Sequence, residues 1–564
     1  MTNIVERRVS DIEEGKVTYK SMSDHYVIIG YGDVTISIIR TIYNITGKRD
    51  TCGDDNKPTQ KYPYTIILTK QDIKTVRSAI FSQLPEKFEK YIYFYSGDIE
   101  SYEHIKSLNI DKAKEIYILG EKNEYGRDSK NLECVKTIAK LRGNQENILT
   151  VNVQFDKLTS YSIIQKISLS DEFLTFNGKR TIYCRPFNFY ENWARTLWGY
   201  KGDLKHNYEK LDFESIEGDK TVHLVIVGFK RMGRALLMEA LRQCHYPNFE
   251  EAPTPKNKTR ITILDRELDA MLPEFLAQYP YLDQIRDIDI KYSNAKIEGK
   301  EVREQLIKDT KDPNTLLTIA ICLEDPDIAL STGLCLPDEV FYTIENNKVK
   351  ETNTRILIRQ ALIQEGIGRL LETNNKKYKN VHIFGMSDKG LCKELMNDDL
   401  AMYVNAYYDI LYYDHTQPSN KNEVIKEYLE YTDGQIKSNQ NLKDDSFIDW
   451  VILPDHHDFM HSIAKRLWLL ISEDTRFANR YQVDLYDTYI KYQHSGKLMQ
   501  MEHLRWNADR SIIGYKDTSE HNLKNNDYKL HKSIIPYCEL SPSEQQKDID
   551  VINNMKKLLN QQVM

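Results

Sequence analysis

The sequence predicts an α/β protein with two doubly wound parallel sheets, followed by a mainly helical C-terminal region. Three observations support this fold class. Short apolar runs alternate with helical stretches through the first two-thirds of the chain. An apolar strand runs into a glycine turn twice, at Gly30 and at Gly228, and helical periodicity dominates from Asp449 onward. At 564 residues the chain is also too long for one hydrophobic core, which stops growing at roughly 250–300 residues.

Composition narrows the classes of protein that fit. The chain is 40% hydrophobic and carries a formal net charge of −7, so it should fold, and nucleic acid is a poor default partner. Its 8 cysteines are scattered without a Cys-x-x-Cys pair, which predicts reduced thiols rather than a zinc or redox site. The longest apolar runs fall well short of the roughly 20 residues that cross a bilayer, and the N-terminus lacks a signal-peptide pattern. We therefore expect a cytoplasmic protein.

The first lobe begins after a polar segment, residues 1–23, that we interpret as a tail or a short packing arm. Tyr26–Ile29 forms a predicted strand that enters the turn at Gly30, and isoleucines then recur at helical spacing. Four further strands are predicted in this lobe, at Thr65–Leu68, Ile92–Tyr95, Glu115–Leu119 and Ile148–Val153. An aromatic-rich helix follows at Phe187–Trp198, and we expect it to serve packing rather than cofactor binding.

The same succession restarts near Thr221. Strands are predicted at Val222–Val227, Arg260–Leu264, Ile288–Tyr292, Leu316–Cys322 and Arg355–Ile358. A further strand at Val381–Phe384 and another at Ile410–Tyr413 extend this lobe, and Thr416–Asp445 is predicted to be a loop or a short exposed helix. The predicted domains are therefore a tail (1–23), a first lobe (24–215), a second lobe with an α/β extension (216–445) and a helical domain (446–564).

Both glycine turns depart from the G-x-G-x-x-G pattern of Rossmann dinucleotide-binding units, in which each glycine has a separate steric role. The first turn keeps Gly30 and Gly32 but has Thr35 in third place, and its second strand ends without the acid that usually holds a ribose hydroxyl. We expect this turn to bind a dinucleotide in altered form or to survive only as topology.

The second turn keeps Gly228 and Gly233 but places Lys230 where the middle glycine belongs. Asp265 follows the next strand, and Arg231 and Arg234 lie near a helix N-terminus, whose free N–H groups favour anions. A phosphate held by these side chains is the functional hypothesis, with topology alone as the alternative. No histidine or lysine is paired with a carboxylate in the manner of a dehydrogenase, so binding is favoured over turnover.

Beyond the turns, two passages resemble the RCK (TrkA-N) family, the cytosolic units that regulate prokaryotic potassium channels and transporters. They are Gly97-Asp98 with Leu108 and Ile110–Leu119, and Ile319–Asp327. The resemblance covers roughly residues 24–370 and implies tandem Rossmann lobes, a nucleotide or ion ligand, a homodimer and a separate membrane channel or transporter subunit as partner.

Residues 501–550 resemble the RyR domain, the repeat named after ryanodine receptors and also found in bacterial and phage proteins. The resemblance lies in Met501–Arg510, Gly514-Tyr515, His531, Ile535–Tyr537, Leu540 and Lys547–Asp550. Tyr515 and Tyr537 stand where bacterial members often carry tryptophan. Together with the RCK resemblance it implies a bacterial source.

Taken from the residues alone, this segment offers a rigid aromatic, guanidiniums and an amide, which suit a planar, phosphorylated ligand. The alternative is that the polar residues knit a small helical domain together while Trp506 lies in its core. The candidate ligand residues are Glu502, His503, Arg505, Trp506, Asn507, Arg510, Tyr515, His531 and Tyr537. His457 and His461 could share a helix face, but a zinc site needs a third ligand, so no metal site is predicted.

The leading hypothesis is a cytosolic regulatory sensor for a nucleotide-like ligand, either NAD-like, an adenine nucleotide or a signalling nucleotide. Its partner would be an ion channel or transporter. A second hypothesis is a sensor or effector of prokaryotic antiviral defence that responds to a signalling nucleotide. A third is an NAD(P)-dependent oxidoreductase or a nucleotide hydrolase, although no catalytic arrangement of residues supports an enzyme.

Overall fold

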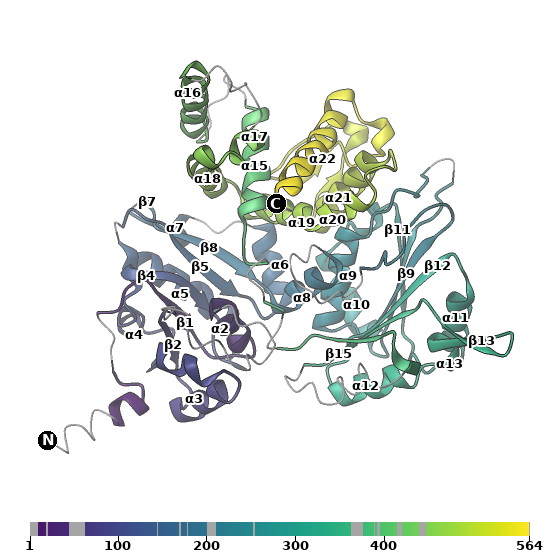
Figure 1. Ribbon diagram of the computed structural model, residues 1–564, viewed down its shortest axis with the longest axis horizontal. Helices are drawn as coiled ribbons and strands as arrows, with labels where there is room; N and C mark the ends of the chain where they lie inside the picture. The colour runs from purple at the N-terminus through teal and green to yellow at the C-terminus, as the bar shows by residue number, and fades with distance from the viewer. Residues whose placement is uncertain are drawn as a thin grey trace, which may run out of the picture. The chain divides into compact units, whose positions relative to one another are not determined.

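The computed structural model (Figure 1) describes residues 10–17, 21–43, 62–143, 145–167, 171–177, 179–199, 210–251, 254–361, 376–387, 390–391, 395–413, 420–438 and 447–562. The chain divides into two compact units. The first unit contains Met1–Asn192 and Met386–Met396, and the second contains Trp193–Gly385 and Asn397–Met564. The second lobe and the helical region thus share a unit, while the predicted division into four domains stays a prediction.

The first unit is built on a six-stranded sheet in which every pair of neighbouring strands is parallel. In spatial order the strands are β3 (Ile92–Ser96), β2 (Thr65–Thr69), β1 (His25–Ile29), β4 (Ala113–Ile118), β5 (Leu149–Gln154) and β8 (Ile182–Phe187). Its helices are α2 (Thr35–Tyr43), α3 (Ile73–Phe81), α4 (Tyr102–Lys106), α5 (Arg127–Arg142), α6 (Leu158–Lys166) and α7 (Asp171–Leu174). The strand order reverses beside β1, which is the point where doubly wound sheets bind ligands.

Strand β8 was not predicted, because Arg185 and Pro186 interrupt its apolar run. It lies at the edge of the sheet, the position in which proline is tolerated. At the opposite edge, the Ser96 backbone N–H of β3 donates to the Gly15 carbonyl, so the described part of the N-terminal segment packs as an arm.

The second unit repeats the architecture with the same strand order, again entirely parallel. The strands are β11 (Ile288–Ser293), β10 (Thr259–Leu264), β9 (Thr221–Val227), β12 (Thr315–Ile321), β15 (Arg355–Arg359) and β16 (Val381–Phe384). Helices α9 (Arg231–Gln243), α10 (Leu268–Gln278), α11 (Lys300–Lys311), α12 (Pro326–Leu334) and α13 (Asp338–Phe341) connect them, with a hairpin of β13 (Tyr342–Glu345) and β14 (Lys348–Glu351). The predicted fold class of two doubly wound lobes is therefore confirmed.

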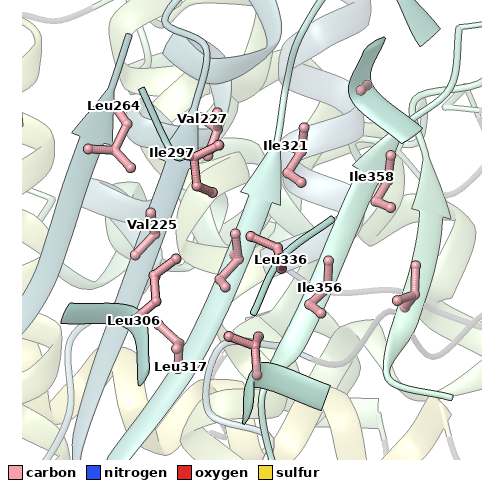
Figure 2. Close-up of a cluster of buried hydrophobic side chains, with 14 of the residues drawn as sticks. Val225, Val227, Leu264, Ile297, Leu306, Leu317, Ile321, Leu336, Ile356 and Ile358 are labelled. Atoms are coloured by element: carbon pink, nitrogen blue, oxygen red, sulfur yellow. The ribbon is translucent and has the colours of Figure 1, made fainter. Parts of the chain in front are cut away.

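Strand β9 is buried along nearly its whole length, as expected of a central parallel strand covered on both faces. On one face, Val225 and Val227 join a hydrophobic cluster with side chains of α11, α12 and α13 (Figure 2). On the other face, the Ile226 side chain approaches Gly233 of α9. Successive side chains of β9 thus face opposite sides of the sheet, and those on the second side pack under α9, the helix that follows the second glycine turn.

The C-terminal part of the second unit is mainly helical, as predicted. Its helices are α15 (Asp399–Leu411), α16 (Asn422–Ser438), α17 (Phe447–Val451), α18 (Pro454–Leu469), α19 (Glu473–Asp484), α20 (Tyr486–Lys491), α21 (Leu498–Ile512) and α22 (Pro542–Gln562), with a small pair of strands, β17 (Lys516–Asp517) and β18 (Leu530–His531). Helix α8 (Phe189–Trp198) confirms the predicted aromatic helix, and the Arg195 guanidinium forms two hydrogen bonds with the Asp484 carboxylate of α19.

One local prediction was wrong and another was right only in part. The predicted strand at Ile410–Tyr413 does not form: Ile410 and Leu411 end α15, whose residues 401–407 are buried throughout, so tertiary packing overrides local β-propensity. Thr416–Asp445, predicted to be a loop or a short exposed helix, contains α16, which is a helix but has 17 residues and buries Val424, Ile425 and Tyr428. Residues 414–419 and 439–446 of that prediction lie outside the described residues.

Candidate functional site

Strand register places the two glycine turns in equivalent positions. Ile29 of β1 and Val227 of β9 each end a central strand that pairs with a neighbour on both sides. Counting outward from these pairs, three positions correspond between the lobes: Gly32 with Lys230, Thr69 with Asp265, and Glu121 with Glu324. Differences at these positions therefore show how each turn has diverged.

The second turn has the close strand-to-helix approach that its glycines predict. Gly228 has φ +95°, a backbone conformation that residues with a Cβ rarely adopt. A Cβ added to Gly233 would lie 2.0 Å from the Gly228 carbonyl oxygen, so only glycine fits there. Helix α9 therefore begins directly above the turn, and its first N–H groups lie at the carboxyl edge of the sheet.

Both carboxylate oxygens of Asp265 accept hydrogen bonds from backbone N–H groups. Its Oδ2 accepts the Phe229 backbone N–H at 2.8 Å, and its Oδ1 accepts the Glu267 N–H at 2.9 Å. Lys230 precedes α9 with its side chain 50% exposed, and its Nζ lies 3.4 Å from Oε2 of Glu324, which is equally exposed. This ion pair is weak and can open, because both groups are well solvated.

The predicted arginines differ in surroundings. Arg231 is the first residue of α9 and is exposed. Arg234 faces inward: its Nε donates to the Phe229 carbonyl at 3.2 Å, and its guanidinium lies over the rings of Phe229 and Phe275, 5.4 and 6.0 Å from their centroids. Lys230 and Arg231 are thus the two cations that the second turn presents outward.

The first turn has the same backbone shape. Gly30 has φ +90°, and a Cβ there would lie 2.3 Å from the Gly120 carbonyl oxygen. Thr35, in the third glycine position, is fully buried, and its hydroxyl accepts the Gly32 N–H at 3.0 Å. Gly32 leaves room for Arg127, since a Cβ would lie 3.2 Å from Nη2 of that guanidinium.

At the first turn, the buried carboxylate of Glu121 accepts hydrogen bonds from the turn and from the end of β2. Its two oxygens accept the Tyr31 N–H at 3.4 Å, the Thr69 hydroxyl at 2.8 Å, the Lys70 N–H at 3.0 Å and the Gln71 amide at 2.7 Å. Sequence reasoning missed this residue, because the acid comes from the end of β4 and not from the end of β2. A phosphate placed at this turn would meet a buried negative charge, which disfavours binding there.

In the helical region, the predicted ligand residues fall into an ion pair in the interior, a group that contacts a neighbouring loop, and a cluster around Trp506. Glu502 and Arg505 are interior: Nε and Nη2 of Arg505 donate to the Glu502 carboxylate at 2.8 and 2.7 Å, and both side chains are at most 3% exposed. The same carboxylate accepts the Gln482 amide and the Tyr489 hydroxyl. These residues hold α21 to α19 and α20.

His503 and Asn507 support a neighbouring loop. The Nε2 of His503 and the Nδ2 of Asn507 both lie within hydrogen-bonding distance of the Ile535 carbonyl, at 2.8 and 3.2 Å. Asn507 is 4% exposed, and its Oδ1 has no hydrogen-bond partner within the described residues. Tyr537, partly buried, lies 6.0 Å from the His503 ring.

The remaining four candidates, Trp506, Arg510, Tyr515 and His531, gather into what we call the aromatic site. The Trp506 ring meets the His531 ring edge to face at 4.9 Å, and Tyr515 lies 6.3 Å from His531. The Arg510 guanidinium lies over both Trp506 and Tyr515. Trp506 is partly buried and packs against a buried cluster of Ile513, Tyr515 and Ile534, so both the ligand hypothesis and the structural alternative stay open for it.

The protonation state of His531 follows from one hydrogen bond and from its burial. Its Nδ1 accepts the Ser533 backbone N–H at 3.1 Å, so the proton of the neutral ring is on Nε2, which has no partner among the described residues. Burial, reinforced by the positive charges of Lys524 and Arg510, lowers the pKa of His531 to about 4. The ring is therefore neutral near pH 7.

Lys529 and Lys524 were missed by the sequence reasoning. The Lys529 ammonium lies 5.2 Å from the Tyr515 ring centroid and 3.8 Å from Oδ2 of Asp474. Lys529 has φ +50°, a left-handed backbone that lysine adopts only when the surrounding loop imposes it. The polar sequence around Asn525 and Asn526 carries no signal that would identify this loop, since its folding back onto α21 is a tertiary feature.

The histidine pair of α18 was also considered in the sequence analysis as a metal site. His457 and His461 both lie near the Tyr403 hydroxyl, at 3.3 and 3.0 Å, and no group of three or more His, Cys, Asp or Glu side chains in the described ranges is placed to hold a metal ion. Among the described helices, none combines the length and the apolar character that a bilayer-crossing helix requires.

Comparison with known proteins gives weak likenesses. No protein-family model matches the chain, and no curated protein matches it significantly in sequence. Among solved structures, the GsuK channel bound to NAD is 10% identical, covers 69% of this chain and 65% of that chain, and has a TM-score of 0.36. GsuK bound to ADP is 12% identical, with 69% and 72% covered and a TM-score of 0.34. The human SLO3 gating ring is 11% identical, with 64% and 80% covered and a TM-score of 0.33.

Proposed function

We propose that this chain is a cytoplasmic regulatory protein that binds a nucleotide-like ligand and communicates the bound state to a partner. The second glycine turn is the observation that supports this function best. Gly228 and Gly233 bring the start of α9 onto the carboxyl edge of a parallel sheet, and exposed Lys230 and Arg231 flank it. Free N–H groups, the positive end of a helix and two cations together favour a phosphate.

The aromatic site offers the same ligand class a second position. A planar base can stack on partly exposed Trp506, and Arg510 and Lys529 can neutralise phosphates. Adenine nucleotides, NAD-like dinucleotides and signalling nucleotides share this chemistry. The sites supply binding groups without a paired nucleophile and base, and we infer binding rather than turnover.

We infer that the partner is a separate channel or transporter subunit and that the chain acts as a homodimer. The support is the sequence resemblance of residues 24–370 to cytosolic units that regulate such proteins. Purification of the full chain from its native cells in mild detergent tests this role. A co-purifying membrane transport protein is the expected result, and a dimer that carries none would contradict the partner.

Calorimetric titration of the full chain with ADP and with NAD tests ligand binding. Lys230→Glu should weaken the affinity about ten-fold or more, because a hydrogen bond to a charged group contributes about 1.5–3 kcal/mol. Lys300→Glu, at an 88%-exposed site on α11, is the charge-matched control and should change the affinity less than two-fold, roughly the effect of a surface charge. Equal losses in both variants, or no binding of either nucleotide at millimolar concentration, would refute the proposal.

A further inference from the structure

One glutamine of the second lobe binds the helical region with its whole amide group. Gln284 lies in a short 3-10 turn (Leu282–Gln284) between α10 and β11. Its Nε2 donates to the Ser511 hydroxyl at 3.1 Å and to the Tyr515 carbonyl at 3.0 Å, and its Oε1 accepts the Asp517 N–H at 2.8 Å. Both amide hydrogens and the oxygen are thus used, which fixes the amide firmly.

These partners belong to the segments that form the aromatic site. Ser511 follows Arg510 in α21, and Tyr515 is itself a member of the site. Two residues after Gln284, the Arg286 guanidinium donates to the Ile534 carbonyl at 3.2 Å. Ile534 is 1% exposed and packs with Tyr515, with Trp506 resting against them. Gln284 and Arg286 therefore hold both chain segments that carry the aromatic rings.

The other end of the same stretch of chain reaches the second glycine turn. Phe275 of α10 packs edge to face on Phe229, the residue after Gly228, with ring centroids 5.0 Å apart. Tyr279 packs on Phe275 at 5.1 Å, and the two aromatics are at most 7% exposed. Helix α9, which starts at the turn, also packs against α21. Close-packed groups of this kind transmit a displacement rather than absorb it.

We propose that residues 268–286, which we call the coupling segment, link the aromatic site energetically to the second glycine turn. This inference rests on the proposed function, since it states how two ligand sites influence each other. A phosphate bound at the turn shifts Phe229, and Phe229 shifts Phe275 through the contact between their rings. The segment then repositions Gln284 and Arg286, and with them Tyr515 and Ile534. By thermodynamic reciprocity, a ligand at the aromatic site alters the affinity of the turn by the same factor.

Amide hydrogen exchange of the full chain tests the coupling without any ligand. Phe275→Leu loosens the contact with Phe229 and should speed exchange in residues 511–517 and 530–535 about five-fold or more, the lower bound of ordinary allosteric coupling. Leu276→Ala, on the same helix at a 40%-exposed position, is the matched control and should leave these segments unchanged. In a Gln284→Ala background, Phe275→Leu should cause no further increase.

The inference fails if Phe275→Leu speeds exchange at residues 228–236 while 511–517 and 530–535 exchange at the wild-type rate. Should that variant unfold the second unit, seen as fast exchange throughout α15 and α18, Phe275→Met carries the same test, because its flexible unbranched side chain adapts to an irregular gap. A separate arm adds ADP to Trp506→Ala, in which only the turn remains as a site. Slower exchange at 228–236 and 511–517 supports the coupling, and slower exchange at 228–236 alone overturns it. Absence of protection everywhere refutes the proposed ligand, while the ligand-free variants still decide the coupling.

Discussion

Gly233→Ala tests the geometry on which the proposed ligand site depends. In an ordinary helix, alanine is more favourable than glycine by about 1 kcal/mol. At Gly233, however, the added Cβ would lie 2.0 Å from the Gly228 carbonyl oxygen, well inside the 3.4 Å at which ordinary contact begins. The obstacle is backbone of the turn itself, so α9 and β9 must separate. Overpacking of this kind costs about 1–3 kcal/mol and sometimes more.

We expect the cost to exceed the helical gain, with a net loss of up to about 2 kcal/mol and a thermal midpoint lower by a few degrees. Gly434→Ala is the matched control, because Gly434 lies inside α16 with nothing within 4 Å of its Cβ position. That variant should be more stable by about 0.5–1 kcal/mol. Scanning calorimetry compares both with the wild type, and ADP titration should show weaker binding only in Gly233→Ala. If both variants were equally stabilised, the close approach of α9 to the turn would be disproved.

Two further predictions concern the helical region. Because the unfolded chain protonates His531 near pH 6.5 and the folded chain only near 4, acidification between these values should destabilise the protein. His531→Gln should flatten this dependence in unfolding followed across pH 4–7, and an unchanged slope would contradict the assignment. Arg195→Met leaves the Asp484 carboxylate buried without its main partner and should cost about 3–5 kcal/mol. Lys350→Met, which removes only an exposed ion pair with Glu345, should leave the thermal midpoint nearly unchanged.

Apart from the edge strand β8, the strands of both sheets were predictable, because central parallel strands are short apolar runs that end at a glycine or a polar turn. Strand β9 shows this most clearly, since Val222–Val227 is apolar apart from His223 and is followed directly by Gly228. Helix α15 shows the limit of such patterns. Its end at Ile410 and Leu411 and the two tyrosines that follow were predicted as a strand from local propensity. The helix forms because its buried part, residues 401–407, packs against other helices, which the local sequence does not encode.

The candidate sites were predictable to different degrees. Helical spacing placed Glu502, Trp506 and Arg510 on one helix but could not separate interior from surface, because α21 is buried on nearly every side. Glu502 turns out to pair inside the fold, whereas Trp506 is partly exposed. Lys529 reaches the aromatic site through a loop, and no pattern in the sequence connects it with Trp506.

In both lobes the backbone N–H after the leading glycine donates to a carboxylate, but the carboxylate comes from a different strand in each lobe. In the first lobe the N–H after the leading glycine is accepted by Glu121, from the strand on one side of the turn. In the second lobe the equivalent N–H is accepted by Asp265, from the strand on the other side. The position equivalent to Glu121 is thereby released: Glu324 stands exposed and meets Lys230 only in a solvated ion pair. An anion can displace Glu324 from Lys230 at little cost, whereas it would have to replace four hydrogen bonds to remove Glu121. If the proposed function holds, this exchange of carboxylates favours the second turn over the first as the ligand site.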